Sequence, residues 1–169
     1  MLDGVSSPLI TPHSRQNGLV EEDLVEKGYR VLTRSPTAGV DTFVRRGVGL
    51  SVFFQGHPEY DADTLMREYY RDVGRFLNGR RAHHPNTPTG YFDLEVEAAL
   101  AELSWRARRR PDPNLAPRYA AILAKASPIR TWRGTSVKIY RNWLRHIAQA
   151  SRPARLSGVA MRGFERSVV

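Results

Sequence analysis

Apolar and polar residues in the first third of the chain follow a pattern that predicts a short helix and then three strands. Residues 19–27 are acidic with apolar residues on one side, and Gly28 is suited to end a helix there. Three strand-like runs follow, over residues 29–33, 40–45 and 50–55. The glycines of residues 46–49 suit a tight hairpin turn. Residues 50–54 are nearly all apolar, so we expect a strand covered on both faces.

The rest of the chain carries the three- and four-residue spacing of amphipathic helices. Four helices are predicted, over residues 61–78, 94–109 and 117–125 and from residue 135 onward. Asp61 or Asp63 can cap the first of these helices. Its expected buried face consists of Leu65, Tyr69, Val73, Phe76 and Leu77. The last helix has an apolar set of its own, made of Val137, Tyr140, Leu144 and Ile147. Residues 80–92 form a loop in which we expect His83 and His84 to be solvated.

The order of these elements is unusual for a self-sufficient domain. Strands come first, helices fill the rest, and no strand–helix–strand unit precedes the hairpin. A central strand at residues 50–55 needs more neighbouring strands than these residues supply. We therefore expect residues 1–150 to be the second half of a larger α/β domain. Residues 151–169 are basic and interrupted by Gly, Ser and Pro, and we expect a disordered tail there.

Composition narrows the class of protein. The 169 residues are 41% hydrophobic and 25% charged, as in a globular protein of one domain or a little more. No run approaches the ~18 apolar residues of a membrane span, and no signal peptide is visible, so the cytoplasm is the expected compartment. The sequence contains no cysteine. This excludes disulfides, zinc–thiolate sites, iron–sulfur clusters and thiol catalysis from these residues.

Positive charge is concentrated in the second half of the chain. Residues 1–79 hold nine Lys/Arg against eleven Asp/Glu, whereas residues 80–169 hold seventeen against six. A basic half can bind nucleic acid, an acidic membrane surface or a phosphate-bearing ligand such as coenzyme A. Most of these cations are Arg, which an arginine-rich genome also explains. No basic–aromatic alternation forms a stacking platform. We therefore expect neither nucleic acid nor membrane as a partner, and a basic binding module is the weakest of three hypotheses.

The residues with the clearest chemical content directly follow the apolar strand. The string Gly-His-Pro-Glu-Tyr-Asp occupies residues 56–61, beyond the carboxyl end of that strand, where open α/β sheets bind ligands. Residues two apart in extended backbone point to the same side. Glu59 can therefore accept the imidazole N–H of His57, fix its tautomer and stabilise its protonated form. The pair is a general base with its orienting acid, or a strand-end histidine with a local hydrogen bond. A metal site with Asp61 lacks a second histidine at a suitable spacing, and we predict none.

The same string resembles the homoserine O-acyltransferase family, the O-succinyltransferases and O-acetyltransferases of methionine biosynthesis. Two further strings of that family occur in the same order, Pro-His-Ser-Arg at residues 12–15 and Trp-Arg…Asn-Trp-Leu at residues 132–133 and 142–144. His-Pro-Glu alone would also resemble the related class I glutamine amidotransferases, but the Pro-His-Ser-Arg string favours the acyltransferases. The resemblance covers residues 8–77 well and residues 130–148 loosely.

This resemblance implies a doubly wound, flavodoxin-like α/β fold of the class I glutamine amidotransferase kind. In the family, a cysteine takes the acyl group from acyl-CoA, and the hydroxyl of L-homoserine then takes it from the enzyme. His57 matches the general base and Glu59 the third member of the triad. Ser14 and Arg71 match residues that contact the substrate, and a guanidinium can pair bidentately with the homoserine carboxylate. Acyl-CoA is a co-substrate, and no further cofactor is implied.

The sequence also departs from the family pattern. The nucleophilic cysteine, the oxyanion hole and the determinant of acyl choice precede the Pro-His-Ser-Arg string in the family and do not occur here. Ser14 and Ser51 are substitutes by residue type only, since neither lies in a nucleophile elbow. Residues 93–128 resemble a helical insertion. We expect an acyltransferase completed by its missing half or by a homodimer mate; the alternative is a non-catalytic remnant or a partner-completing subunit.

Overall fold

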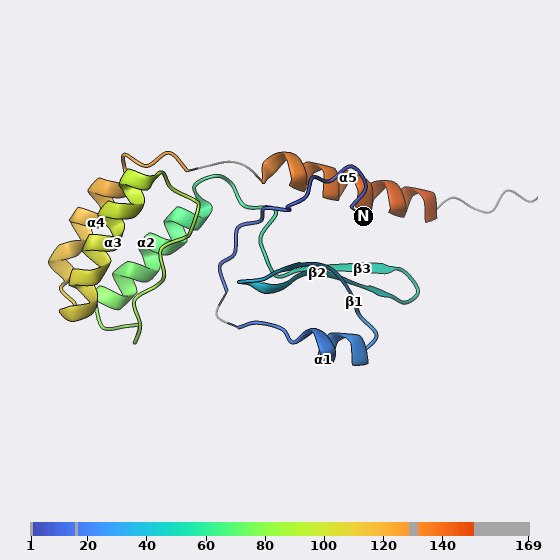
Figure 1. The fold of residues 1–169 in the computed structure, drawn as a ribbon, viewed down its shortest axis with the longest axis horizontal. Helices are drawn as coiled ribbons and strands as arrows, with labels where there is room; N and C mark the ends of the chain where they lie inside the picture. The colour runs from blue at the N-terminus through green and yellow to red at the C-terminus, as the bar shows by residue number, and fades with distance from the viewer. Residues whose placement is uncertain (1, 16, 129–131, 151–169) are drawn as a thin grey trace, which may run out of the picture.

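Two groups of elements make up the fold, and the computed structural model describes them over residues 2–15, 17–128 and 132–150. In chain order the elements are α1 (Glu21–Glu26), β1 (Arg30–Ser35), β2 (Gly39–Arg46), β3 (Leu50–Phe54), α2 (Thr64–Leu77), α3 (Leu94–Arg109), a 3-10 turn (Pro113–Leu115), α4 (Ala116–Leu123) and α5 (Arg133–Ala150). Helices α2, α3 and α4 group together, and the sheet lies beside them between α1 and α5 (Figure 1). The predicted elements are all present within a few residues of their expected bounds.

The sheet is antiparallel, in the order β1-β2-β3. The predicted hairpin joins β2 to β3, with Arg46 opposite Leu50 in the register. Residues 40–44 of β2 are all buried, so β2 is the central strand. The rings of Phe43 and Phe53 stack across the hairpin with centroids 5.1 Å apart, and Tyr29 meets both edge-on. Aromatic pairs of this kind add to the stability that area burial alone provides.

One expectation about the sheet needs correction. The strand predicted to be covered on both faces, β3, is an edge strand of the described sheet, and Phe53 is 38% exposed. The α/β class is confirmed. The described sheet is small and antiparallel, because tight turns join its strands and no helix crosses between two of them. A doubly wound, flavodoxin-like arrangement of the larger domain stays a prediction.

The helical group has the larger core. All five predicted core residues of α2 are buried, and they meet buried residues of α3 and α4, namely Val96, Leu100, Leu103, Ala107, Tyr119 and Leu123. Asp93 is the N-cap of α3, and its carboxylate accepts the backbone N–H of Val96 at 2.9 Å. Asp63 stands at the N-cap of α2, as predicted, but its side chain makes no capping bond and instead pairs with Arg67 at 2.8 Å.

His84 contradicts the prediction that it is solvated. It is 8% exposed, and its Nδ1 donates to the backbone carbonyl of Pro85 at 2.6 Å while its Nε2 accepts the Tyr119 hydroxyl at 2.9 Å. Burial lowers the pKa of His84 below its usual value. The prediction failed because α4, about 35 residues further along the chain, brings Tyr119 over the loop.

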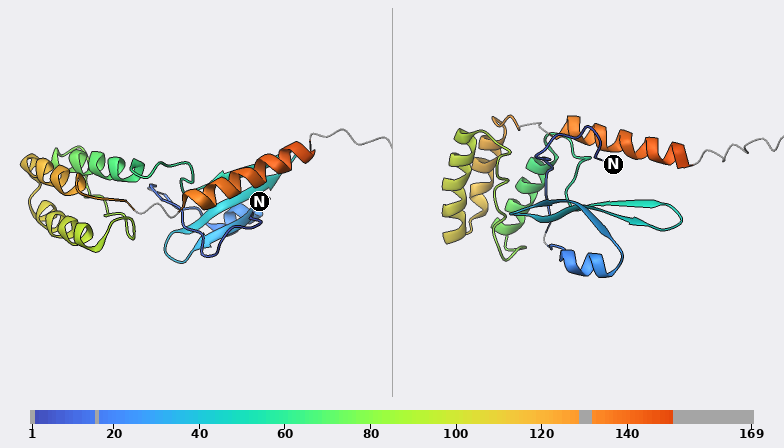
Figure 2. Two further views of the ribbon diagram at one scale, coloured as in Figure 1. Left: turned by 90° about the horizontal axis from the view of Figure 1, so that it is seen from above. Right: turned by 45° about the vertical axis from the view of Figure 1, so that its right-hand side comes forward.

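The last helix, α5, lies along one face of the sheet, and α1 lies at the other (Figure 2). Tyr140 of α5 meets Phe54 of β3, with ring centroids 6.1 Å apart. Ile139 is 2% exposed, but the predicted apolar face is only partly covered, since Val137, Leu144 and Ile147 are exposed. None of the helices in the described ranges is both long and apolar enough to cross a bilayer. The predicted tail, residues 151–169, lies outside the described residues.

Candidate active site

His57 follows β3 directly, as the sequence predicts. Its backbone N–H donates to the carbonyl of Pro12 at 2.8 Å, which ties the end of β3 to the N-terminal segment. Its ring Nδ1 lies 2.9 Å from the Glu59 carboxylate, so the expected contact is present. Since a carboxylate accepts, Nδ1 carries the hydrogen, which leaves Nε2 with a free lone pair. The pair can therefore take up a proton at Nε2 and stabilise the resulting positive charge.

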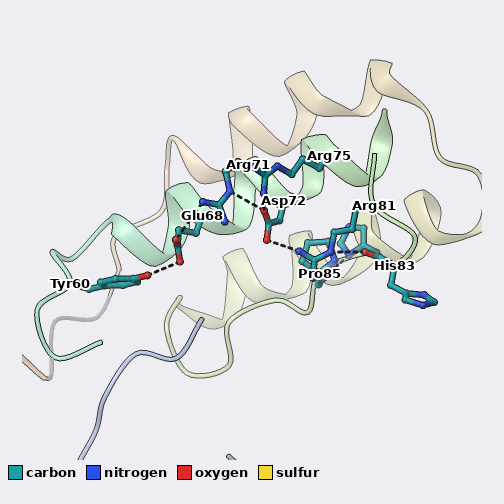
Figure 3. Close-up of polar contacts among 9 residues, drawn as sticks. Tyr60, Glu68, Arg71, Asp72, Arg75, Arg81, His83 and Pro85 are labelled. Atoms are coloured by element: carbon teal, nitrogen blue, oxygen red, sulfur yellow. Dashed lines mark hydrogen bonds and ion pairs between the residues drawn. The ribbon is translucent and has the colours of Figure 1, made fainter. Parts of the chain in front are cut away.

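Tyr60 connects this pair to the helix α2. Its ring stacks on His57, with centroids 4.1 Å apart and planes 14° apart, and its hydroxyl donates to Glu68 at 2.9 Å (Figure 3). Burial, together with the neighbouring Glu68 carboxylate, raises the pKa of Tyr60 to about 12. The phenol therefore stays protonated and remains a hydrogen-bond donor at neutral pH.

Ser14 and Arg71 come together in one groove, although they are far apart in the sequence. The groove has a volume of about 440 Å³ and lies between residues 13–15, the helix α2 and the loop 81–88. Arg71 is 48% exposed, and its Nε donates to Asp72 at 2.9 Å. Its Nη1 lies 3.5 Å from Glu68. The guanidinium is thus anchored on one side and open to a ligand on the other.

The carboxylates of this groove are held ionised. Burial alone would raise the pKa of Glu68, but hydrogen bonding by Ser14 and Tyr60 and the positive charge of Arg71 outweigh it, so the pKa is lowered. Burial would also raise the pKa of Asp72, but this pKa is lowered because the carboxylate faces three guanidiniums. These lie at 2.6 Å (Arg81), 2.9 Å (Arg71) and 3.3 Å (Arg75), and Figure 3 shows them grouped around the carboxylate.

Sequence reasoning missed Glu68, although a signal for it exists. Glu68 stands three residues before Arg71, a spacing that places the two side chains next to each other on a helix. Of the two substitute nucleophiles, Ser14 lines the groove, whereas Ser51 is exposed on β3 opposite Arg45 and is not among the residues that line it. Within the described ranges, no three carboxylates or imidazoles converge where they could hold a metal ion.

A histidine–carboxylate pair that Tyr60 connects to a groove of charged side chains has the chemistry needed to accept a proton next to a small, charged ligand. Comparison with known sequences identifies the class more closely. The family model described as homoserine O-succinyltransferase matches residues 1–153. The chain belongs to the homoserine O-succinyltransferase family, which confirms the resemblance.

Individual relatives agree with this assignment. The chain is 44% identical over 153 residues to a homoserine O-succinyltransferase of Rhodopseudomonas palustris, a match that covers 90% of this chain and 45% of the relative. It is 44% identical over 145 residues to the protein of that name in Bradyrhizobium japonicum, covering 86% and 44%. The corresponding protein of Methylococcus capsulatus is 38% identical over 144 residues, covering 82% and 39%. The chain thus spans less than half the length of these relatives.

Proposed function

We propose that this chain supplies the general base and the homoserine-binding groove of a cytoplasmic homoserine O-succinyltransferase acting in methionine biosynthesis. The observation that carries the proposal is the convergence of Ser14 and Arg71 on one groove, which Tyr60 and Glu68 connect to the His57–Glu59 pair. Relatives that match 82–90% of this chain carry that enzyme name.

The charges in the groove suit an amino acid. A free amino acid carries a carboxylate and an ammonium two bonds apart, and the groove presents the Arg71 guanidinium 3.5 Å from the Glu68 carboxylate. Arg71 can pair with the substrate carboxylate through two parallel hydrogen bonds. Glu68 can accept from the ammonium, and Ser14 can donate to or accept from either group. We therefore assign L-homoserine to this groove, with succinyl-CoA as the acyl donor in keeping with the family name.

In the proposed reaction, His57 acts on the hydroxyl of bound homoserine. Its Nε2 takes the hydroxyl proton as the homoserine oxygen attacks the acyl carbon of a thioester on the enzyme. The new C–O bond forms, the C–S bond breaks, and the thiolate leaves with the electron pair. Glu59 holds the ring by Nδ1 and stabilises its positive charge during the transfer. General-base help of this kind typically contributes ~10²–10⁴-fold to rate.

The thiol in this scheme comes from polypeptide outside these residues. The sequence has no cysteine, so a second copy of the chain cannot supply one either. Among the described residues, no strand pairs with the outer edge of β3. This edge supports a further proposal, that additional strands join the sheet here and complete a doubly wound fold. The sites of acyl-CoA binding and of the oxyanion hole would lie in that added part.

The test begins with the intact mass of the native gene product and of any chain that copurifies with it. The assembled protein is then assayed for O-succinylhomoserine formation from succinyl-CoA and homoserine. We expect His57→Ala to lower kcat by ~10²–10⁴-fold. His83→Ala is the matched control, because His83 is an exposed histidine of the loop and lies outside the groove. Its rate should equal that of the wild type.

Two outcomes would contradict the proposal. Equal rates for the wild type and His57→Ala would show that His57 is not the general base. A complete lack of transfer by the assembled protein would favour a non-catalytic subunit. Transfer by the isolated chain at a rate that His57→Ala abolishes would instead place the nucleophile among these residues. Ser14→Ala would then test the serine in the groove.

A further inference from the structure

Asp41 is a buried carboxylate that the scheme above does not use. It lies on the central strand β2 between Val40 and Thr42, and it is 5% exposed. A buried carboxylate is costly unless several partners satisfy it. Burial would raise the pKa of Asp41, but its hydrogen bonds outweigh burial, so the pKa is lowered and the group is ionised at neutral pH.

The two oxygens of Asp41 face different parts of the molecule. Oδ2 accepts the hydroxyls of Thr33 at 2.9 Å and Thr42 at 3.0 Å, both within the sheet. Oδ1 accepts the backbone N–H of Gly56 at 3.1 Å and lies 3.3 Å from Nε2 of His13. Oδ2 is therefore bonded within the sheet, whereas Oδ1 contacts two segments outside the sheet, those of Gly56 and His13.

These two segments carry the candidate site. Gly56 immediately precedes His57, and His13 immediately precedes Ser14. The segments also bond to each other directly, through the His57 N–H and the Pro12 carbonyl. The contact leaves no room at Gly56, since a Cβ there would come within 2.8 Å of Asp41 Oδ1 and 3.0 Å of His13 Nε2.

We propose that Asp41 is a positioning residue for acyl transfer. Its Oδ1 holds the segment of the general base His57 in a fixed position relative to the substrate-contacting Ser14. The inference rests on the proposed function for the roles of His57 and Ser14. It adds a residue that touches neither substrate nor reacting atoms, but that joins the two chain segments on which the site is built.

The test uses the 169-residue chain and amide hydrogen exchange measured by NMR. In Asp41→Ala, the His57 amide, which bonds Pro12, should exchange 10–100-fold faster than in the wild type. Asp41→Asn restores an acceptor for the Gly56 N–H and should bring exchange back to within about threefold. Thr42→Val is the matched control, because it removes a partner of Oδ2 and leaves the contacts of Oδ1 in place.

The same variants are then assayed in the assembled enzyme. Asp41→Ala should lower kcat at least tenfold, Asp41→Asn should recover most of the loss, and Thr42→Val should stay within threefold of the wild type. Normalising exchange at His57 to that of a helical-core amide such as Val73 corrects for general destabilisation. If Asp41→Ala fails to fold, the chemical shift of the Gly56 amide proton is compared between Asp41→Asn and Thr42→Val instead. This proton should move upfield only in Asp41→Asn, because a neutral acceptor replaces a charged one.

Unchanged His57 protection or unchanged kcat in Asp41→Ala would overturn the proposal, as would equal Gly56 shifts in Asp41→Asn and Thr42→Val. Failure of the proposed function has a different signature. If the wild-type assembly forms no O-succinylhomoserine, the catalytic roles of His57 and Ser14 are wrong and Asp41 positions nothing for catalysis. The exchange data would then still decide whether Asp41 holds the two segments together.

Discussion

Asp41, Glu68 and Asp72 share a property that governs how the protein responds to acid. The pKa of each carboxylate is lowered in the folded state by hydrogen bonds and neighbouring cations that outweigh burial. A group whose pKa is depressed on folding stabilises the fold above its unfolded pKa and loses that contribution as pH falls through its folded pKa. The model-compound value for aspartate is 3.8, so the loss belongs below about pH 4.

Asp72→Asn tests this at one residue. We expect the variant to be less stable than the wild type at pH 7 by about 1 kcal/mol, because three guanidiniums lose their shared carboxylate. The difference should be smaller at pH 3 than at pH 7, because pH 3 lies below the model-compound pKa of 3.8 and the stabilisation is lost as pH falls below that value. Urea unfolding at both pH values gives the two free energies. Glu22→Gln, on the exposed side of α1, should show no such convergence.

Two glycines show how elements depend on space as well as on backbone freedom. At Gly56, a Cβ would come within 2.5 Å of the Thr11 methyl and 2.8 Å of Asp41 Oδ1. At Gly74, inside α2, a Cβ would meet nothing within 4 Å. We therefore expect Gly56→Ala to destabilise the protein by about 1–3 kcal/mol through overpacking. Gly74→Ala should stabilise it by about 0.5–1 kcal/mol, because alanine is the better helix former.

Chemical unfolding of these two variants measures both changes. Equal effects at the two positions would show that the tight contact at Gly56 relaxes without cost. Glycine can be required because there is no space for a Cβ or because the backbone has a positive φ angle. The comparison tests space alone, since neither residue has the positive φ angle that is found at Gly28, Gly79 and Gly90.

Elements defined by local signals could be predicted from the sequence, whereas contacts between distant segments could not. The spacing of Leu65, Tyr69 and Val73 fixes the buried face of α2 by itself, and the pairing of His57 with Glu59 follows from two-residue periodicity. The burial of His84 depends on Tyr119 of α4, and no local pattern contains that information. The same holds for Asp41, the acidic residue of β2. No local pattern predicts its contacts with Gly56 and His13, which lie on other segments of the chain.

The exposed apolar residues of β3 and α5 have a different explanation. Their pattern predicts burial, but Phe53 and Leu144 are exposed, because no layer of the described residues covers them. An apolar pattern indicates which residues are suited to burial, but it does not show which segment covers them.

At the scale of the whole molecule, the described residues form two separate cores of unequal size. The helical core contains fourteen buried residues from α2, α3, α4 and the segments beside them, whereas the core under the sheet contains three, Leu24, Val40 and Phe43. Buried apolar area is the main source of folding stability. We therefore expect the sheet to unfold at a lower urea concentration than the helices, so that unfolding is not two-state.

Two probes separate the transitions. Trp132 is 4% exposed in the helical core, so its fluorescence reports that core once Trp105→Phe and Trp143→Phe remove the other two tryptophans. Amide exchange along residues 40–44 reports the sheet. The sheet midpoint should come first. Coincident midpoints for the two probes would show that the cores unfold as one unit.

The walls of the groove come from both cores. Arg71 belongs to α2, while Ser14 lies on a segment fastened to the sheet through the His13–Asp41 contact and through Arg15, which donates to the Val40 carbonyl at 3.2 Å. A ligand that engages both residues binds only when the cores keep their native spacing. By mass action, an amino acid at a hundred times its Kd would favour that spacing by about 2.7 kcal/mol. The concentration of that amino acid would then regulate how long the core under the sheet stays folded. When the amino acid is scarce, proteases would cleave the sheet before the helices.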